Sequence, residues 1–407
     1  MTTLKTLFNR NLSFLWVGQF ISQSGDSITH MAIIWLMLEL TGSKAMTGFI
    51  AFAATLPALL FGLFAGVLAD KYPRKIIMLI SDSARFFLIL SIPLLYSQDL
   101  LTPLVLAIIV FITFTFASLF NPARDSIIPQ IADGKDINKV NALVQSTGYL
   151  SYFVGLFGAG ILLGVMGLIP LFLFDALTFA FSIVFILLIR VPKKIEPTYA
   201  SRHFDELKAG FRYIITEDRR ILWLLLITAL NNFFIMGPAI VGTPILIKEI
   251  WNGTGQDFAF VESSYGLGML LATFAVIKLI SNKSRGKWLM GALVFDGLTF
   301  IPLGFLSVLP GNPMTNAIII IFIHSLGIPF IQVTRTSLIH SIVDNKMQGR
   351  IFSMIYLAVI GTTSLSVLVT GIAAEYWSME TIYIFIGFGA CFTGLLGWLK
   401  KDIRNLQ

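Results

Sequence analysis

Long apolar runs alternate with short polar segments along the whole chain. A run of about 20 apolar residues crosses a bilayer as a helix, because a helix pairs its backbone groups internally. The alternative, a membrane β-barrel, gives much weaker alternating segments. The runs predict twelve spans, at 12–38, 45–69, 76–97, 102–123, 139–164, 168–190, 221–247, 258–280, 287–309, 314–337, 349–374 and 380–399. The pattern therefore predicts an all-α membrane protein with twelve transmembrane helices.

The longest polar stretch divides these spans into two sets of six. We expect an N-terminal six-helix bundle over 1–190, a cytoplasmic linker over 191–220 and a C-terminal six-helix bundle over 221–407. Within the linker, apolar residues recur at three- and four-residue spacing, which predicts an amphipathic helix on the membrane surface. The halves also resemble each other, since Arg74 and Arg124 precede Arg285 and Arg335 by the same 211 residues.

Composition agrees with a membrane protein and charge gives its orientation. Of the 407 residues, 56% are hydrophobic and 13% charged, about half the charged fraction of a soluble domain. With both termini placed inside, Lys44 and Lys248 are the only cations in outer loops, and Arg85 lies within a span. The remaining lysines and arginines lie at or beside inner loops, which predicts cytoplasmic termini. The net charge of +7 therefore indicates membrane orientation rather than nucleic-acid binding.

One polar turn between the second and third spans carries a family resemblance. It runs from Gly66 through Asp70 and Lys71 to Arg74 and Lys75, in the pattern G-x-x-x-D-[KR]-x-x-[RK]-[RK]. This pattern resembles the signature loop of the major facilitator superfamily, with Pro73 where the family usually has glycine. Four further stretches resemble its bacterial macrolide and multidrug efflux branch of drug:proton antiporters, which also contains siderophore exporters: 40–43, 121–125, 175–179 and 349–353.

The resemblance implies a transport function. It implies a monomeric secondary active transporter in a bacterial inner membrane that exports an amphiphilic small molecule, such as a drug, macrolide or siderophore. Export by this branch uses proton antiport and alternating access, without a cofactor. Import of a siderophore, or transport of a lysophospholipid, remains open within the same fold. A membrane sensor or enzyme is the alternative from another class, but no nucleophile motif, phosphate-binding loop or metal-ligand spacing favours an enzyme.

Polar residues in the first span are the candidates for proton coupling. Asp26 and His30 are four residues apart and share a helix face. Ionisable groups at membrane depth are costly and commonly belong to proton relays, so we predict that Asp26 carries the proton and that His30 assists it. A structural acid bonded to a neighbouring helix is the alternative interpretation. In the third span, Asp82 and Arg85 are close enough to pair, and we interpret them as a structural or gating ion pair. The resemblance places Asp175 and Asp296 on peripheral helices as well, and we give them the same interpretation. Whether Asp26 or one of Asp82, Asp175 and Asp296 carries the proton stays open.

Other polar and aromatic residues are candidates for the substrate cavity and the gate. The resemblance implies that the first, fourth, seventh and tenth spans line the cavity, and candidates on them are Gln23, Ser27, Thr113, Phe114, Asn231, Asn232 and His324. The resemblance also implies that Asp70 meets the cytoplasmic N-terminus of the eleventh helix, where the helix dipole favours an anion. The gating candidates are Asp70, Arg74, Arg124 and Arg350, with Arg124 as a partner of Asp70.

Overall fold

The computed structural model describes residues 9–132, 137–191, 210–214, 218–280 and 285–406. Across these ranges the regular secondary structure is helical, with no β-strand, which confirms the predicted all-α class. The chain forms two compact units. Unit 1 contains residues 1–40 and 53–200, and unit 2 contains residues 41–52 and 201–407. Each unit is described separately below.

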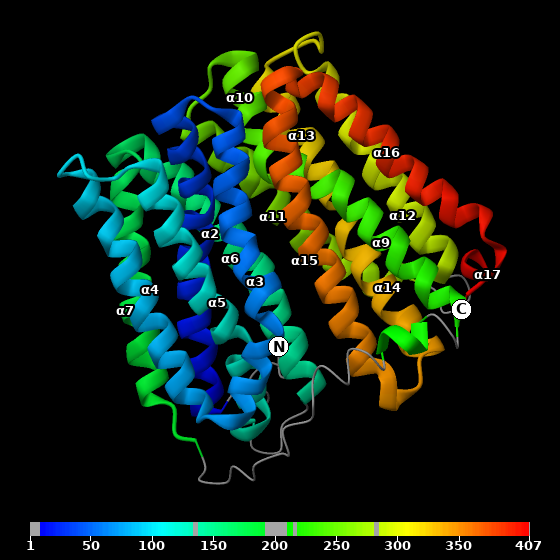
Figure 1. Cartoon of the computed structure of the whole chain (residues 1–407), viewed down its shortest axis with the longest axis horizontal. Coiled ribbons are helices and arrows are strands. Elements are labelled where there is room, and N and C mark those ends of the chain that lie inside the picture. Colours follow the sequence, from blue (N-terminus) through cyan, green and yellow to red (C-terminus); the bar gives the residue numbers. More distant parts are fainter. Residues whose placement is uncertain (1–8, 133–136, 192–209, 215–217, 281–284, 407) are drawn as a thin grey trace. The chain divides into compact units, whose positions relative to one another are not determined.

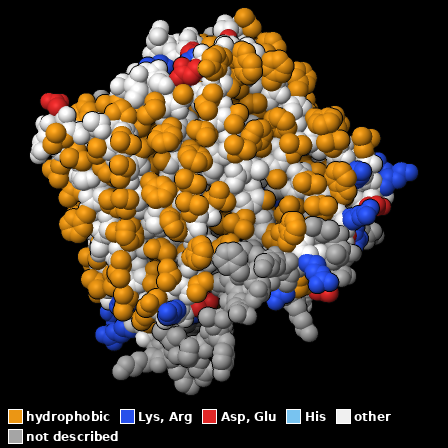
Figure 2. Space-filling view, in the orientation of Figure 1, with side chains coloured by type: hydrophobic (Ala, Val, Ile, Leu, Met, Phe, Trp, Pro, Cys, Tyr) orange, Lys and Arg blue, Asp and Glu red, His pale blue; other side chains and the backbone are white. Residues whose placement is uncertain are grey.

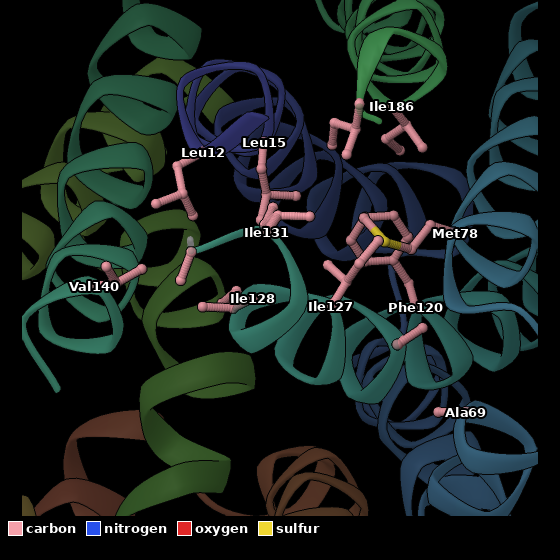
Figure 3. Packing of buried hydrophobic residues seen from close by; sticks show 13 residues of the cluster. Leu12, Leu15, Ala69, Met78, Phe120, Ile127, Ile128, Ile131, Val140 and Ile186 are labelled. Carbon is pink, nitrogen blue, oxygen red and sulfur yellow. The ribbon is translucent and has the colours of Figure 1, made fainter. Parts of the chain in front are cut away.

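Unit 1 is built from six long helices, coloured blue to green in Figure 1, except that residues 41–52, where the first helix ends and the second begins, belong to unit 2. Their hydrophobic side chains meet in a core that draws on every one of these helices, including Leu15, Met78, Phe120, Ile127 and Ile186 (Figure 3). Burial of these side chains fixes how the polar residues of the unit face one another. The helices are α2 (Arg10–Thr41), α3 (Lys44–Lys71), α4 (Arg74–Tyr96), α5 (Pro103–Ile131), α6 (Ile137–Met166) and α7 (Ile169–Leu188).

Unit 2 also contains six spans, several of them built from more than one helical segment. One of its cores joins α9, α12 and α14 through residues such as Leu224, Met290 and Leu338. The segments are α9 (Arg219–Gly237), η1 (Pro238–Gly242), α10 (Thr243–Trp251), α11 (Gly255–Leu279), α12 (Arg285–Phe300), η2 (Ile301–Phe305), α13 (Pro313–Ser325), α14 (Ile328–Ile342), α15 (Asn345–Tyr376), α16 (Met379–Leu399) and the short α17 (Lys401–Arg404).

Prolines lie at the irregular points of unit 2, which include the 3₁₀ turn η2 and two breaks within spans. Pro238 has no N–H for the helical ladder, and the five residues from Pro238 to Gly242 form a π-helical turn between α9 and α10. A second break separates α13 from α14 next to Gly327 and Pro329. The first break lies within the span predicted at 221–247, directly after Gly237. The second divides a span predicted as continuous, immediately after His324.

The helices have the length and surface expected in a bilayer. Eleven helical runs among the described residues are long and apolar enough to span a membrane. Helix α2, 32 residues long, is the first span along the chain and brings the number of spans to twelve. Polar residues in its middle lower its mean hydropathy. Hydrophobic side chains cover most of the face seen in Figure 2, and lysines and arginines lie near its margins. Side chains such as Phe87 and Phe385, 67% and 71% exposed, are stable there only if lipid covers them.

The predicted linker lies largely outside the described residues. Its described part, 210–214, is helical. Within this part Phe211 is exposed, whereas Ile214 is buried against Ile221, Ile339 and Ile351 of unit 2. The remainder of the predicted amphipathic helix stays a prediction.

Two glycines of α12 provide a matched test of the helix packing in unit 2. A Cβ on Gly297 would lie 2.6 Å from the carbonyl oxygen of Gly387 and would also collide with the Cys391 backbone, whereas a Cβ on Gly291 meets nothing within 4 Å. We expect Gly297→Ala to lower the free energy of unfolding by about 1–3 kcal/mol or more, because α16 cannot move away without losing its packing. Gly291→Ala should be neutral or raise stability by up to about 1 kcal/mol. Thermal unfolding of the purified variants in detergent measures both, and equal midpoints would contradict the expectation.

Candidate functional site

The polar interior of unit 1 is organised around Arg85. This side chain, on α4, is only 3% exposed and forms ion pairs with Asp26 of α2 and Asp82 of α4. Its Nη1 lies 3.2 and 3.3 Å from the two carboxylate oxygens of Asp26. Asp82 is completely buried and also accepts a hydrogen bond of 2.6 Å from the Ser182 hydroxyl of α7. The predicted pairing of Asp82 with Arg85 is confirmed. Arg85 has a second ion-pair partner, Asp26.

Aromatic rings hold the Arg85 guanidinium in place. Its central carbon lies 4.4 Å from the ring centroid of Phe179 and 4.9 Å from that of Phe120. Cations are attracted to the faces of such rings, more strongly where water is excluded. The guanidinium is therefore fixed on α4 while the side chain of Asp26, 43% exposed, is the most accessible member of the cluster.

A third carboxyl group, Asp175 of α7, lies in the same interior. It is fully buried and accepts hydrogen bonds from Thr29 of α2 at 2.6 Å and from Thr178 at 2.9 Å. Gly25 allows this approach, because a Cβ there would collide with the Asp175 carboxyl and the Thr178 hydroxyl. The sequence analysis interpreted Asp175 as a structural or gating residue and left open whether it carries the proton; the assignment of the proton to one of these acids stays a prediction.

The charges of this cluster do not balance. Asp26 interacts electrostatically with both other acids, and all three acids interact with the guanidinium of Arg85. If the three acids and Arg85 all ionised, they would carry two net negative charges, at a high cost in a region of low dielectric constant. The positive charge of Arg124, which also acts on Asp26, offsets at most one of them. The arrangement therefore favours at least one bound proton, and the half-buried Asp26 is best placed to exchange it.

His30 lies one helical turn from Asp26 without contacting it. Its ring packs edge-on against Phe114, with centroids 5.9 Å apart, and no hydrogen bond joins it to Asp26 among the described residues. The ion-pair partner of Asp26 is Arg85 instead. A role for His30 in proton coupling stays a prediction.

The cavity candidates of unit 1 differ in exposure. Gln23 and Ser27 are half-buried on α2; the Gln23 amide donates to Gln19 and the Ser27 hydroxyl donates to the Gln23 carbonyl. Thr113 of α5 is 5% exposed, and its hydroxyl has no hydrogen-bond partner in the described structure. Phe114 is half-buried beside His30. Their predicted contact with cargo remains a prediction.

The candidates of unit 2 are more deeply placed. Asn231 is 7% exposed and donates to Asp296 of α12 at 2.9 Å, and His324 is 1% exposed beside the same carboxyl group. Asn232 is half-buried and donates to the Val359 carbonyl, 2.9 Å away, and to hydroxyls of α15. A separate cavity of about 420 Å³ between α12 and α14, lined by apolar side chains and Lys287, contains none of the predicted cavity residues.

Asp70 and Arg74 lie on either side of the turn between α3 and α4, whereas Arg124 lies within α5 and Arg350 near the start of α15. One predicted pairing is wrong. The Asp70 carboxylate, 45% exposed, lies 3.9 Å from Arg74, whereas Arg124 pairs with its neighbour Asp125 at 2.8 Å and not with Asp70. Arg74 is four residues from Asp70 and reaches it within one turn, so no partner from α5 is needed. Arg350, in unit 2, donates to the Met347 sulfur at 3.3 Å. The gating roles of these residues stay predictions.

Comparison with known proteins places the chain in a family. The family model described as transmembrane secretion effector, of the major facilitator superfamily, matches residues 1–401. The chain belongs to this family. Its members are transporters rather than enzymes, which confirms both the predicted superfamily and the expectation that the chain is not an enzyme. The chain is therefore a multi-pass membrane transporter of small-molecule substrates.

Two of the relatives within the superfamily are efflux proteins of low identity. Macrolide efflux protein A of Streptococcus pyogenes is 26% identical over 348 residues, which cover 84% of this chain and 83% of the relative. The multidrug efflux pump Tap of Mycobacterium tuberculosis is 22% identical over 412 residues, which cover 98% of this chain and 96% of the relative. The crystal structure of the nucleoside transporter NupG matches with a TM-score of 0.80 at 12% identity, covering 96% of this chain and 99% of that one. This structural likeness confirms the fold.

Proposed function

We propose that this transporter exports an amphiphilic small molecule in exchange for protons, by alternating access, across a bacterial cytoplasmic membrane with both termini in the cytoplasm. The observation that carries the proposal is the cluster of Asp26, Asp82 and Asp175 around Arg85. An interior with more carboxyl groups than cations binds a proton, and a half-buried member of the cluster can release it. The excess of lysine and arginine in the predicted inner loops supports the orientation.

The efflux relatives support the direction and the class of cargo. Both relatives are named for efflux, one of macrolides and one of multiple drugs. Macrolides are bulky molecules that combine apolar and polar groups, and such ligands bind in largely apolar sites with few polar contacts. Within unit 1, the half-buried Gln23, Ser27 and Phe114 offer such surroundings.

Reconstitution tests this function directly. Purified protein in liposomes should move a macrolide or a fluorescent lipophilic cation when a pH gradient is imposed, in the direction opposite to the proton flow. A protonophore, which collapses the gradient, should stop the movement. Movement that depends only on sodium, or that continues unchanged without any gradient, would show that the proposed coupling is wrong. Protein-free liposomes with the same gradient give the background rate.

A further inference from the structure

A second polar cluster lies in the interior of unit 2, around Asp296 of α12. The Asp296 side chain is 1% exposed, and its Oδ2 accepts a hydrogen bond from the Asn231 amide of α9 at 2.9 Å. The Asn231 carbonyl oxygen in turn accepts from the Thr393 hydroxyl of α16 at 3.2 Å. The other carboxylate oxygen, Oδ1, lies 3.4 Å from Nδ1 of His324, at the end of α13. Four helices thus contribute to one buried carboxyl group.

The hydrogen bonds determine which ring nitrogen of His324 carries the proton. The Thr299 hydroxyl lies 3.0 Å from Nδ1, and it donates its own hydrogen to backbone carbonyls of α12 at 2.9 Å. Thr299 is therefore placed to accept a hydrogen bond from Nδ1, and the negative charge of Asp296, 3.4 Å away, also favours the proton on this nitrogen. The other nitrogen, Nε2, is left with a lone pair. Neither Nε2 of His324 nor Oδ1 of Asp296 has a hydrogen-bond partner in the described part of the chain.

The charge of Asp296 has no fixed counterion. Among the described residues, no lysine or arginine forms an ion pair with it, whereas Asp82 in unit 1 pairs with Arg85. Both acids lie in the third span of their unit. Asp82 accepts a hydrogen bond directly from the Ser182 hydroxyl of the sixth span. Asp296 is linked to the Thr393 hydroxyl of the sixth span through Asn231. A buried carboxylate without a cation is strongly destabilising. In unit 2 the group able to supply a positive charge is His324.

The other titratable groups around this pair do not neutralise it. Tyr265 of α11 stacks on the His324 ring, with centroids 6.1 Å apart. On α16, the Tyr383 hydroxyl donates to the Pro238 carbonyl at 2.9 Å and the Cys391 thiol donates toward the Val294 carbonyl at 3.5 Å. The ring of Phe300 packs edge-on against the His324 ring, with centroids 4.3 Å apart, and excludes water from that side. None of these groups brings a positive charge to Asp296.

We propose that Asp296 and His324 together form a second proton-binding site, within unit 2. A proton from solution binds Nε2 of His324, and the resulting imidazolium is held against the Asp296 carboxylate through Nδ1–H. The pair then changes from a net charge of −1 to zero, and release of the same proton restores it. This site goes beyond the proposed function, which uses the carboxyl groups of unit 1 alone, and it does not depend on the identity of the cargo.

Nitrogen NMR of the full-length protein in lipid tests the site without a transport assay. The chain contains four histidines, and with ¹⁵N-labelled histidine the two ring nitrogens report both tautomer and charge. We expect His324, assigned by its loss in His324→Gln, to convert with rising pH from imidazolium to the neutral form protonated on Nδ1. In Asp296→Asn the imidazolium loses its counterion, so its formation should need at least a roughly tenfold higher proton concentration, equivalent to one pH unit. Asp402→Asn, at an exposed acid of α17, is the matched control and should leave the conversion unchanged.

The possible results separate this site from the proposed function. A carboxylate band in the infrared spectrum that shifts as His324 titrates and is absent in Asp296→Asn also supports the pair, because Asp296 stays ionised in both of its states. The site is overturned if His324 stays neutral at every pH at which the protein is folded, whether or not a carboxylic acid band of Asp296 appears. It is also overturned if Asp296→Asn leaves the His324 conversion unmoved. The wild-type titration needs no variant, so misfolding of a variant does not prevent the test, and transport can persist in liposomes even if this site fails.

Discussion

Replacing Asp26 by asparagine is expected to abolish cargo movement driven by a pH gradient, to the level of protein-free liposomes. Asparagine has nearly the same size, and its amide oxygen can still accept a hydrogen bond from Arg85, which also keeps its ion pair with Asp82. The local packing should therefore survive while the most accessible titratable group of the cluster is lost. Cargo binding, measured by fluorescence of the same lipophilic cation, should stay within a few-fold of wild type.

The matched control for this variant is Asp99→Asn. Asp99 is exposed in the loop before α5 and has a positive φ of 57°, which asparagine tolerates well. The Asp99→Asn variant should transport cargo at the wild-type rate. Asp175→Asn provides the comparison within the cluster, because Asp175 accepts hydrogen bonds from the hydroxyl groups of Thr29 and Thr178. If Asp26→Asn transports like wild type and Asp175→Asn does not, the proton is carried by Asp175 and the assignment to Asp26 is wrong.

Replacing Arg85 by methionine is expected to cause the largest loss of stability of any single substitution considered. Methionine keeps much of the volume between Phe120 and Phe179, so the main effect is electrostatic. The fully buried Asp82 and the half-buried Asp26 would lose their cation. Breaking a buried ion pair by removing one partner costs about 3–5 kcal/mol. Denaturant unfolding of purified protein in mixed micelles measures this change.

A double variant distinguishes this charge effect from a packing effect. Asp82→Asn combined with Arg85→Met removes both charges and should recover a large part of the lost free energy of unfolding. Arg190→Met, at an exposed position after α7, is the surface control and should change stability by less than about 0.5 kcal/mol. If the double variant is no more stable than Arg85→Met alone, unpaired charge is not the cause of the loss.

The sequence by itself determined the features that depend on short-range geometry and on overall hydropathy. The apolar runs gave the helical class and the spans, because a helix in lipid must pair its own backbone groups. Asp82 and Arg85 were predicted to pair because three residues bring two side chains together on one helix. The same rule explains why Asp70 pairs with Arg74, four residues away, rather than with the predicted Arg124 of another helix.

Only the tertiary structure decided which polar groups meet across helices. Asp26 pairs with Arg85 from 59 residues away, Asp175 with Thr29 from 146, and Asn231 with Asp296 from 65. These contacts depend on how each helix is rotated about its axis. In a soluble helix the polar face reveals that rotation, but here the faces toward lipid and toward the core are both apolar. The sequence pattern therefore located the acids within the membrane, and the packing of the helices chose their partners.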